Sequence, residues 1–280
     1  MREIHDMLNE LSDYLAKKYI QSFELEDVYK ALVYSISLVA ALKRNPKAIK
    51  LLDALKNTLI PFLRAQSEGD LRKKVEDIVD WSFQVTLAQN AILTDGLANL
   101  EKVVSSIRKE IGTVDHVLII DGMSIIEELI ISAFLKNGYF NSFFLSTIWL
   151  NPVGLTRYMT RQAPVDKKRP TLRDVAGYLA QHLNAEPSKL SYVDEEIHRV
   201  GPIGIEEFVK AINIRKLAEC IQNKAKDGST LILADHGYDI VALNGKYLYV
   251  VHGFSQTNNN ASEPLLLLSR FSVPLVVLKT

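Results

Sequence analysis

The sequence predicts an α/β protein: an α/β/α sandwich with a mostly parallel sheet, preceded by an all-α helical bundle. Two observations predict this class. Residues 1–110 contain two glycines and two prolines, whereas residues 111–280 contain eleven and seven, so turn-forming residues are concentrated in the second part. That second part also alternates strand-like apolar runs with amphipathic helical runs, which is typical of a parallel sheet with helices on both faces.

The first part is predicted to be a small bundle of four or five helices joined by short connections, over residues 1–111. In the run IHDMLNELSDYLAKKY, apolar residues recur at steps of three and four, which is the helical period. The other predicted helices are LEDVYKALVYSISLVAALKR, NPKAIKLLDALKNTLIPFLRAQ, EGDLRKKVEDIVDWSFQVTLAQNAIL and DGLANLEKVVSSIRKEI.

The second part, residues 112–280, is predicted to alternate strands and helices. Its expected strands cover residues 115–121, 140–150, the short stretch 190–196, 229–235, a hairpin over 239–251, and 273–279. Its expected helices cover residues 124–138, 171–183 and 205–228. Asn244 and Gly245 form the dipeptide favoured in two-residue hairpin turns.

The composition is that of an ordinary globular protein, with 48% hydrophobic and 24% charged residues and a formal net charge of zero. The charge balance does not favour nucleic-acid wrapping or membrane association. The single cysteine, Cys220, excludes an intrachain disulfide and a cysteine-rich zinc site. No apolar run reaches the roughly 18 residues of a membrane span, and no signal peptide is recognisable. We therefore expect a cytoplasmic protein without membrane contact.

Polar residues follow several of the predicted strands. Asp121 and Asp194 each end one, Asp235 and His236 together end another, and His252 follows the hairpin; His198 comes one helical turn after Asp194. Because parallel strands present their carboxyl ends at one edge of a sheet, these side chains should converge there. Carboxylates and imidazoles together are ligands for zinc, manganese or magnesium.

Each of these residues also has a simpler interpretation. An aspartate after a strand commonly caps the next helix, and a single histidine near a turn is commonly hydrogen-bonded for structural reasons. Their joint occurrence at strand ends is what favours the metal site. His5, His116 and His182 lie elsewhere and are interpreted as structural.

Five motifs in order resemble the alkaline phosphatase superfamily and, within it, the PglZ domain. They are VLIIDGMS (117–124), LTRYMTR (155–161), VDEEIHRVG (193–201), LILADHGYD (231–239) and VVHGF (250–254). The resemblance covers residues 113–280 and leaves the helical part unmatched. It implies an alkaline phosphatase-like hydrolase domain over residues 112–280 that binds two divalent metal ions, most commonly Zn²⁺, with Mn²⁺ or Mg²⁺ as alternatives.

The resemblance also implies roles for individual residues. One ion would be bound by Asp121, Asp235 and His236, the other by Asp194, His198 and His252, and Thr156 would be the nucleophile in contact with the first ion. A threonine hydroxyl is a weak nucleophile at neutral pH until a cation stabilises its alkoxide. From its position next to Thr156, Arg157 could bind the equatorial phosphoryl oxygens, or it could be an ordinary surface or salt-bridge arginine.

The sequence departs from the family pattern near the nucleophile. In the family a proline precedes the nucleophile by three residues, whereas Pro152 precedes Thr156 by four. The other hydroxyls near predicted strand ends are Ser124, Ser146 and Thr147, and they stay open as alternatives.

The ligand set and the resemblance together predict a metal-dependent phosphoester hydrolase. By analogy with the family, we expect diesters to be favoured, with nucleotides or oligonucleotides among the candidate substrates. The alternative is a catalytically silent PglZ-like interaction or sensing module whose helical half binds a partner protein. A sulfatase is disfavoured, because the superfamily's sulfatases modify a Cys or Ser at the nucleophile position and Cys220 falls in a predicted helix.

Overall fold

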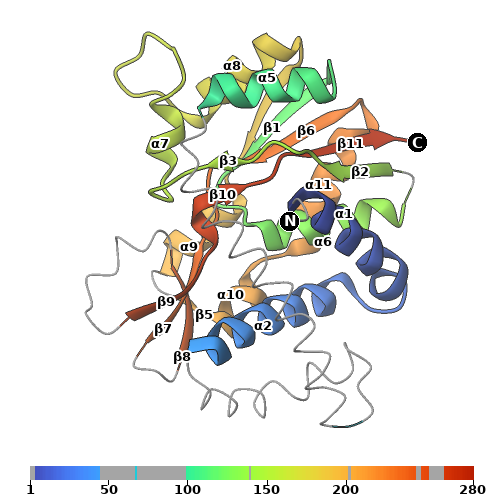
Figure 1. Ribbon diagram of the computed structural model, residues 1–280, viewed down its shortest axis with the longest axis vertical. Coiled ribbons are helices and arrows are strands. Elements are labelled where there is room, and N and C mark those ends of the chain that lie inside the picture. Colours follow the sequence, from blue (N-terminus) through green and yellow to red (C-terminus); the bar gives the residue numbers. More distant parts are fainter. Residues whose placement is uncertain are drawn as a thin grey trace.

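The computed structural model describes residues 4–44, 67, 99–138, 140–200, 203–243, 247–251 and 262–280. Its centre is a five-stranded sheet in the order β2-β11-β6-β1-β4 (Figure 1). The strands are β1 (His116–Ile120), β2 (Phe140–Phe144), β4 (Glu186–Leu190), β6 (Thr230–Ala234) and β11 (Leu275–Lys279). β1 is parallel to β4 and β6, and only β11 runs against the other four. The predicted α/β class with a mostly parallel sheet is therefore confirmed.

Strands β1 and β6 are the pair that places the candidate site. Both are short apolar runs in which every residue is buried, as expected for central parallel strands. Their register pairs His116 with Thr230 and Ile120 with Ala234, so the two strands end level with each other. The residues that follow, Asp121 and Asp235, are thereby brought to the same edge of the sheet.

Helices cover both faces of this sheet, and each face has its own apolar core (Figure 1). One core contains residues of α1 (Ile4–Leu15), α2 (Leu25–Arg44), α6 (Ile125–Lys136), α10 (Ile205–Ala211) and α11 (Ile214–Lys226). The other contains residues of α5 (Leu100–Glu110), α7 (Thr156–Thr160) and α8 (Leu172–Leu183). The alternating side chains of β1 supply both cores: Leu118 and Ile120 face the first, and Val117 and Ile119 the second.

The described helices of the first 111 residues pack directly onto the sheet layers. α1 and α2 contact α6, whereas α5 contacts α8 on the opposite face. Three of the predicted helices in this part are thus present as α1 (continued by the short η1, Ala16–Ile20), α2 and α5. The two helices predicted between them lie outside the described residues, and the domain boundary between residues 111 and 112 stays a prediction.

Polar contacts fix these helices in place. The Asn9 side chain accepts a hydrogen bond from the Phe144 amide at 2.9 Å and donates one to the Phe144 carbonyl at 3.1 Å, so α1 covers the edge strand β2. Arg215 on α11 forms ion pairs with Glu24 at 2.8 Å and Glu26 at 2.9 Å, where α2 begins. None of the helices in the described ranges is long and apolar enough to cross a membrane.

A second, antiparallel sheet lies beside the central one, in the order β5-β8-β7-β9 (Figure 1). Its strands are β5 (Ile203–Gly204), β7 (Asp239–Leu243), β8 (Tyr247–Val251) and β9 (Ser262–Leu267). β7 and β8 pair as the predicted hairpin, in this sheet and not in the central one, and the turn at residues 244–246 lies outside the described residues. β3 (Trp149–Leu150) pairs with β10 (Phe271–Ser272), and the short helix η4 (Leu268–Arg270) leads directly into β10.

Three element predictions were wrong in detail. The strand expected over residues 140–150 is two strands, because β2 belongs to the central sheet and β3 pairs with β10. The strand expected over residues 190–196 ends at Leu190, and Asp194 lies in the first turn of helix α9 (Tyr192–Val200). The helix expected over residues 205–228 is broken into α10 and α11, because Asn213 caps the second helix by accepting a hydrogen bond from the Lys216 amide.

Candidate metal centre

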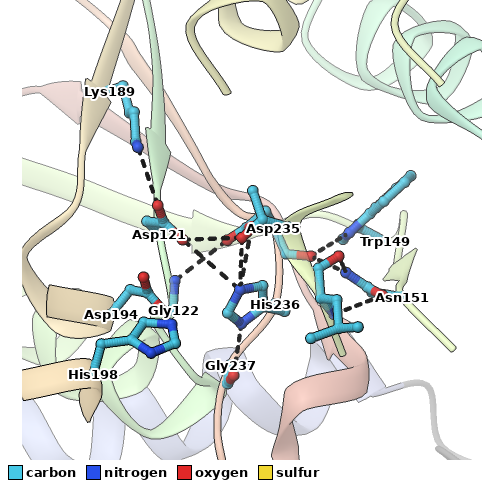
Figure 2. Close-up of polar contacts among 12 residues, drawn as sticks. Asp121, Gly122, Trp149, Asn151, Lys189, Asp194, His198, Asp235, His236 and Gly237 are labelled. Atoms are coloured by element: carbon cyan, nitrogen blue, oxygen red, sulfur yellow. Dashed lines mark hydrogen bonds and ion pairs between the residues drawn. The ribbon is translucent and has the colours of Figure 1, made fainter. Parts of the chain in front are cut away.

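Three buried side chains converge at the carboxyl ends of β1 and β6. Asp121, Asp235 and His236 each offer one ligand atom, and these atoms all lie within 4.8 Å of one another (Figure 2). The exposed fraction is 6% for Asp121 and 0% for Asp235 and His236. Two carboxylates and an imidazole gathered away from water form a donor set suited to a divalent cation.

Glycine at position 122 makes this convergence possible. Gly122 has φ 76°, a conformation that favours glycine, and its amide donates a hydrogen bond to Asp235 Oδ1 at 3.3 Å. A Cβ atom at this position would lie 3.0 Å from the Asp194 backbone. The turn after β1 therefore allows Asp121 to face Asp235 while helix α9 approaches closely.

The His236 ring is oriented by its own backbone neighbour. Its Nδ1 lies 2.8 Å from the Gly237 carbonyl oxygen, which can only accept a hydrogen bond, so Nδ1 carries the proton. Nε2 then faces the carboxylates, 3.4 Å from Asp235 Oδ2 and 3.7 Å from Asp121 Oδ1. A backbone carbonyl that fixes the tautomer in this way is the usual support of a metal-binding histidine.

The titration of the cluster reflects burial and close charges. Burial raises the pKa of Asp235 to about 6, against the lowering effect of the adjacent His236 ring. Burial alone would disfavour the charged form of His236, but the nearby Asp235 and Asp121 carboxylates outweigh it and raise the pKa of this imidazole. Protons held at Asp235 and His236 are the ones that a bound cation would displace.

One atom of the cluster lacks a hydrogen-bond partner. Asp235 Oδ2 is buried, and it accepts no hydrogen bond from any residue in the described part of the chain. A buried carboxylate oxygen without a donor is costly, and a bound cation would satisfy it. The residues present therefore fit a divalent metal ion.

Thr156, the predicted nucleophile, lies beside this cluster. Its half-buried hydroxyl is 3.0 Å from His236 Nε2 and 3.4 Å from Asp121 Oδ1. The loop before it is held by Asn151, whose side chain donates to the Leu155 carbonyl at 2.9 Å and accepts from the Leu155 amide at 3.3 Å. This clamp sets where α7 begins, and Thr156 is the first residue of that helix.

The alternative hydroxyls are bonded elsewhere. Ser124 caps α6 and donates to Glu127 Oε2 at 2.6 Å. Ser146 and Thr147 both donate to the Glu110 carboxylate at the end of α5. Of these four hydroxyls, only that of Thr156 lies within hydrogen-bond distance of the cluster in the described structure.

The second predicted set of ligands is partly visible. Asp194 and His198 form an ion pair on α9, with 3.3 Å between Asp194 Oδ1 and His198 Nε2, as their spacing of four predicts. The Asp194 amide donates to the Asp121 carbonyl at 3.2 Å, so this pair adjoins the first set (Figure 2). His252 lies outside the described residues. Arg157, next to Thr156, is exposed to solvent.

Sequence patterns missed three residues that contact the candidate ligands Asp121 and Asp235. The Lys189 ammonium lies 3.1 Å from Asp121 Oδ2 (Figure 2). Trp149 Nε1 and Asn151 Nδ2 each donate to the Asp235 carbonyl at 2.9 Å. Lys189 is the fourth residue of β4, where it resembles any lysine at a strand end, so only the β1–β4 pairing brings it to Asp121.

No protein-family model matches the chain, and no curated protein matches it. The candidate site is therefore inferred from the geometry of its residues.

Proposed function

We propose that this protein is a metal-dependent phosphoester hydrolase with Thr156 as its nucleophile, built on an alkaline phosphatase-like fold of the PglZ type. The observation that carries the proposal is the position of the Thr156 hydroxyl. It lies 3.0 Å from His236 Nε2 and 3.4 Å from Asp121 Oδ1, beside three buried groups that suit a cation. A nucleophile adjoining a metal-ligand set suits metal-assisted phosphoryl transfer through a covalent intermediate.

The chain's own residues would prepare this reaction. Asp121, Asp235 and His236 would hold a divalent ion, which when bound stabilises an alkoxide and neutralises phosphoryl charge. Asn151 fixes the backbone before Thr156, so the hydroxyl stays in one place while substrate arrives. The exposed Arg157 is close enough in sequence to offer its guanidinium to the phosphoryl oxygens.

A second ion belongs to the same proposal. Asp194 and His198 would hold it together with His252. Mixed carboxylate and imidazole donors favour Zn²⁺, with Mn²⁺ and Mg²⁺ as alternatives. We favour diester substrates, such as a nucleotide or oligonucleotide, by analogy with the family that the five motifs resemble.

The test is hydrolysis of bis-p-nitrophenyl phosphate and of the corresponding monoester by the full chain with Zn²⁺ or Mn²⁺. Thr156→Ala and Asp121→Ala should each lower kcat by at least about a thousandfold, because one removes the attacking oxygen and the other a metal ligand. Metal content measured by mass spectrometry distinguishes the two causes of lost activity, because Thr156→Ala should keep its metal and Asp121→Ala should lose it.

Thr147→Ala is the matched control for Thr156→Ala, because the Thr147 hydroxyl is bonded to Glu110 at 3.2 Å, away from the cluster. Its kcat should equal that of the unaltered protein. If Thr156→Ala retains full turnover, or if Thr147→Ala abolishes it, Thr156 is not the nucleophile.

A catalytically silent metal-binding module is the second candidate. The observation that favours it is that, among the described residues, three groups define a position for one ion only. In this case the helical half would bind a partner protein. It predicts bound metal with no turnover of either ester, and a stable complex recovered when the full chain is used as bait.

A further inference from the structure

A wholly buried glutamate next to the candidate metal centre receives hydrogen bonds from three separate parts of the chain. Glu127, in the first turn of α6, accepts from the Ser124 amide at 2.9 Å and the Ser124 hydroxyl at 2.6 Å through Oε2. Its Oε1 accepts from the Tyr238 hydroxyl at 2.7 Å and from the Tyr29 hydroxyl. Tyr29 belongs to helix α2, near the start of the chain.

The local helix explains only half of these contacts. Ser124 and Glu127 form the capping box that starts α6, which needs no further partner. The two tyrosine hydroxyls come from elements 98 and 111 positions away and meet on one carboxylate oxygen. All three side chains are buried, so each hydroxyl left without this acceptor would be costly.

Tyr238 connects this carboxylate to a metal ligand. It follows His236 by two residues, and the Gly237 carbonyl between them is the acceptor that orients the His236 ring at 2.8 Å. The backbone there is closely packed: a Cβ at Gly237 would lie 2.6 Å from the Leu268 carbonyl oxygen and 2.9 Å from Ser124. The Gly237 peptide, whose carbonyl orients the His236 ring, therefore lies between Ser124 and Tyr238. Both of these residues donate hydrogen bonds to Glu127.

We propose that Tyr29 and Tyr238, acting through Glu127, are positioning residues for the metal ligand His236, so that helix α2 of the N-terminal part sets how tightly the centre holds its ion. This inference rests on the proposed metal centre. Groups that orient a ligand from behind commonly change metal affinity by about 10- to 100-fold.

The experiment compares Co²⁺ and Zn²⁺ binding by the full chain with Tyr29→Phe and Tyr238→Phe. Phenylalanine keeps the packed ring and removes only the hydroxyl. Tyr34→Phe is the matched control, because Tyr34 is a second buried tyrosine of α2 outside the Glu127 network. Affinity is measured by competition with a chelator, coordination by the visible spectrum of bound Co²⁺, and stability by the thermal midpoint.

Both network variants should weaken metal binding by about tenfold and alter the Co²⁺ spectrum, whereas Tyr34→Phe should do neither. The positioning role is overturned if both variants have a metal affinity within about twofold of that of the unaltered protein and the same Co²⁺ spectrum. This holds even if their thermal midpoints are lower. If the unaltered protein binds neither ion, the metal centre itself is wrong and the inference fails with it. These two failures are distinguishable because only the second changes the result for the unaltered chain.

Discussion

At the scale of single residues, Lys189 contacts the candidate centre although no sequence pattern indicated it. Its ammonium is 3.1 Å from Asp121 Oδ2, and its side chain is 25% exposed. The ion pair partly neutralises a ligand that a divalent cation would also use. In the proposed metal centre, Lys189 would therefore compete with the cation for Asp121 and limit the affinity of the site.

Lys189→Met should accordingly strengthen Zn²⁺ binding by about tenfold, which corresponds to about 1.4 kcal/mol. Isothermal titration calorimetry on the full chain measures this change. The matched control is Lys136→Met, because Lys136 pairs with Asp13 at 2.6 Å between α6 and α1 and should not affect binding. Weaker Zn²⁺ binding by Lys189→Met would show that the ammonium supports the site and does not compete for it.

The site residues differ in how far the sequence could foretell them. Asp121, Asp235 and His236 were foreseeable because they come within two residues of the ends of buried strands, and parallel strands bring such residues to one edge. Glu127 and Tyr29 were not, because their meeting depends on how α2 packs over α6, and no spacing in the sequence records it. Asp194 was expected at a strand end and lies instead in a helix, although its pairing with His198 follows from the spacing of four.

At the scale of elements, the turn after β6 is tightly packed against its neighbours at the candidate site. Gly237 lies against the Leu268 carbonyl oxygen and Ser124, with no room for a side chain. The neighbouring elements η4 and α6 therefore fix the path of this turn. By contrast, Gly177 in helix α8 faces open space, with nothing within 4 Å of a Cβ placed there.

This contrast predicts opposite effects of the same substitution. Gly237→Ala should destabilise the fold by about 1–3 kcal/mol through overpacking, and it should weaken metal binding because His236 must move. Gly177→Ala should stabilise the fold by about 0.5–1 kcal/mol because alanine is the better helix former. Urea unfolding of both variants measures the two changes. A stability for Gly237→Ala equal to that of the unaltered protein would show that the turn can relax.

The sequence predicted the order of the strands and helices better than the direction of each strand or the points at which an element is interrupted. Apolar runs bounded by turn residues located β1, β6 and β11, because burial on both faces leaves a strong signal. The reversed direction of β11 has no local signal, since it depends on which neighbours the strand finds. The breaks within residues 140–150 and 205–228 follow from pairing with β10 and from the Asn213 cap, which apolar content does not reveal.

At the scale of the whole molecule, a second buried carboxyl links stability to pH. Burial, reinforced by the nearby Glu127 carboxylate, raises the pKa of Glu128 to about 8, against the lowering effect of hydrogen bonds from Ser272 and Val273. The folded protein therefore keeps this proton over a range in which the unfolded chain, near its ordinary pKa of 4.5, has lost it.

The contribution of Glu128 to stability should be complete below about pH 4.5 and should decline as pH rises to about 8, by at most about 1.4 kcal/mol per pH unit. Glu128→Gln, which mimics the protonated carboxyl, should remove this decline. The free energy of unfolding of both proteins, measured from pH 5 to 8, provides the comparison. Parallel curves would show that Glu128 does not hold its proton in the folded state.

The alignment of the carboxyl ends of β1 and β6 has a consequence for folding. The candidate centre joins parts of the chain that are 113 positions apart, as between Gly122 and Asp235. Such a contact forms only after slow, long-range strand pairing, so an incompletely folded chain cannot assemble the three ligands. Uptake of a cation by the centre would therefore mark the completion of folding and stabilise only the finished sheet.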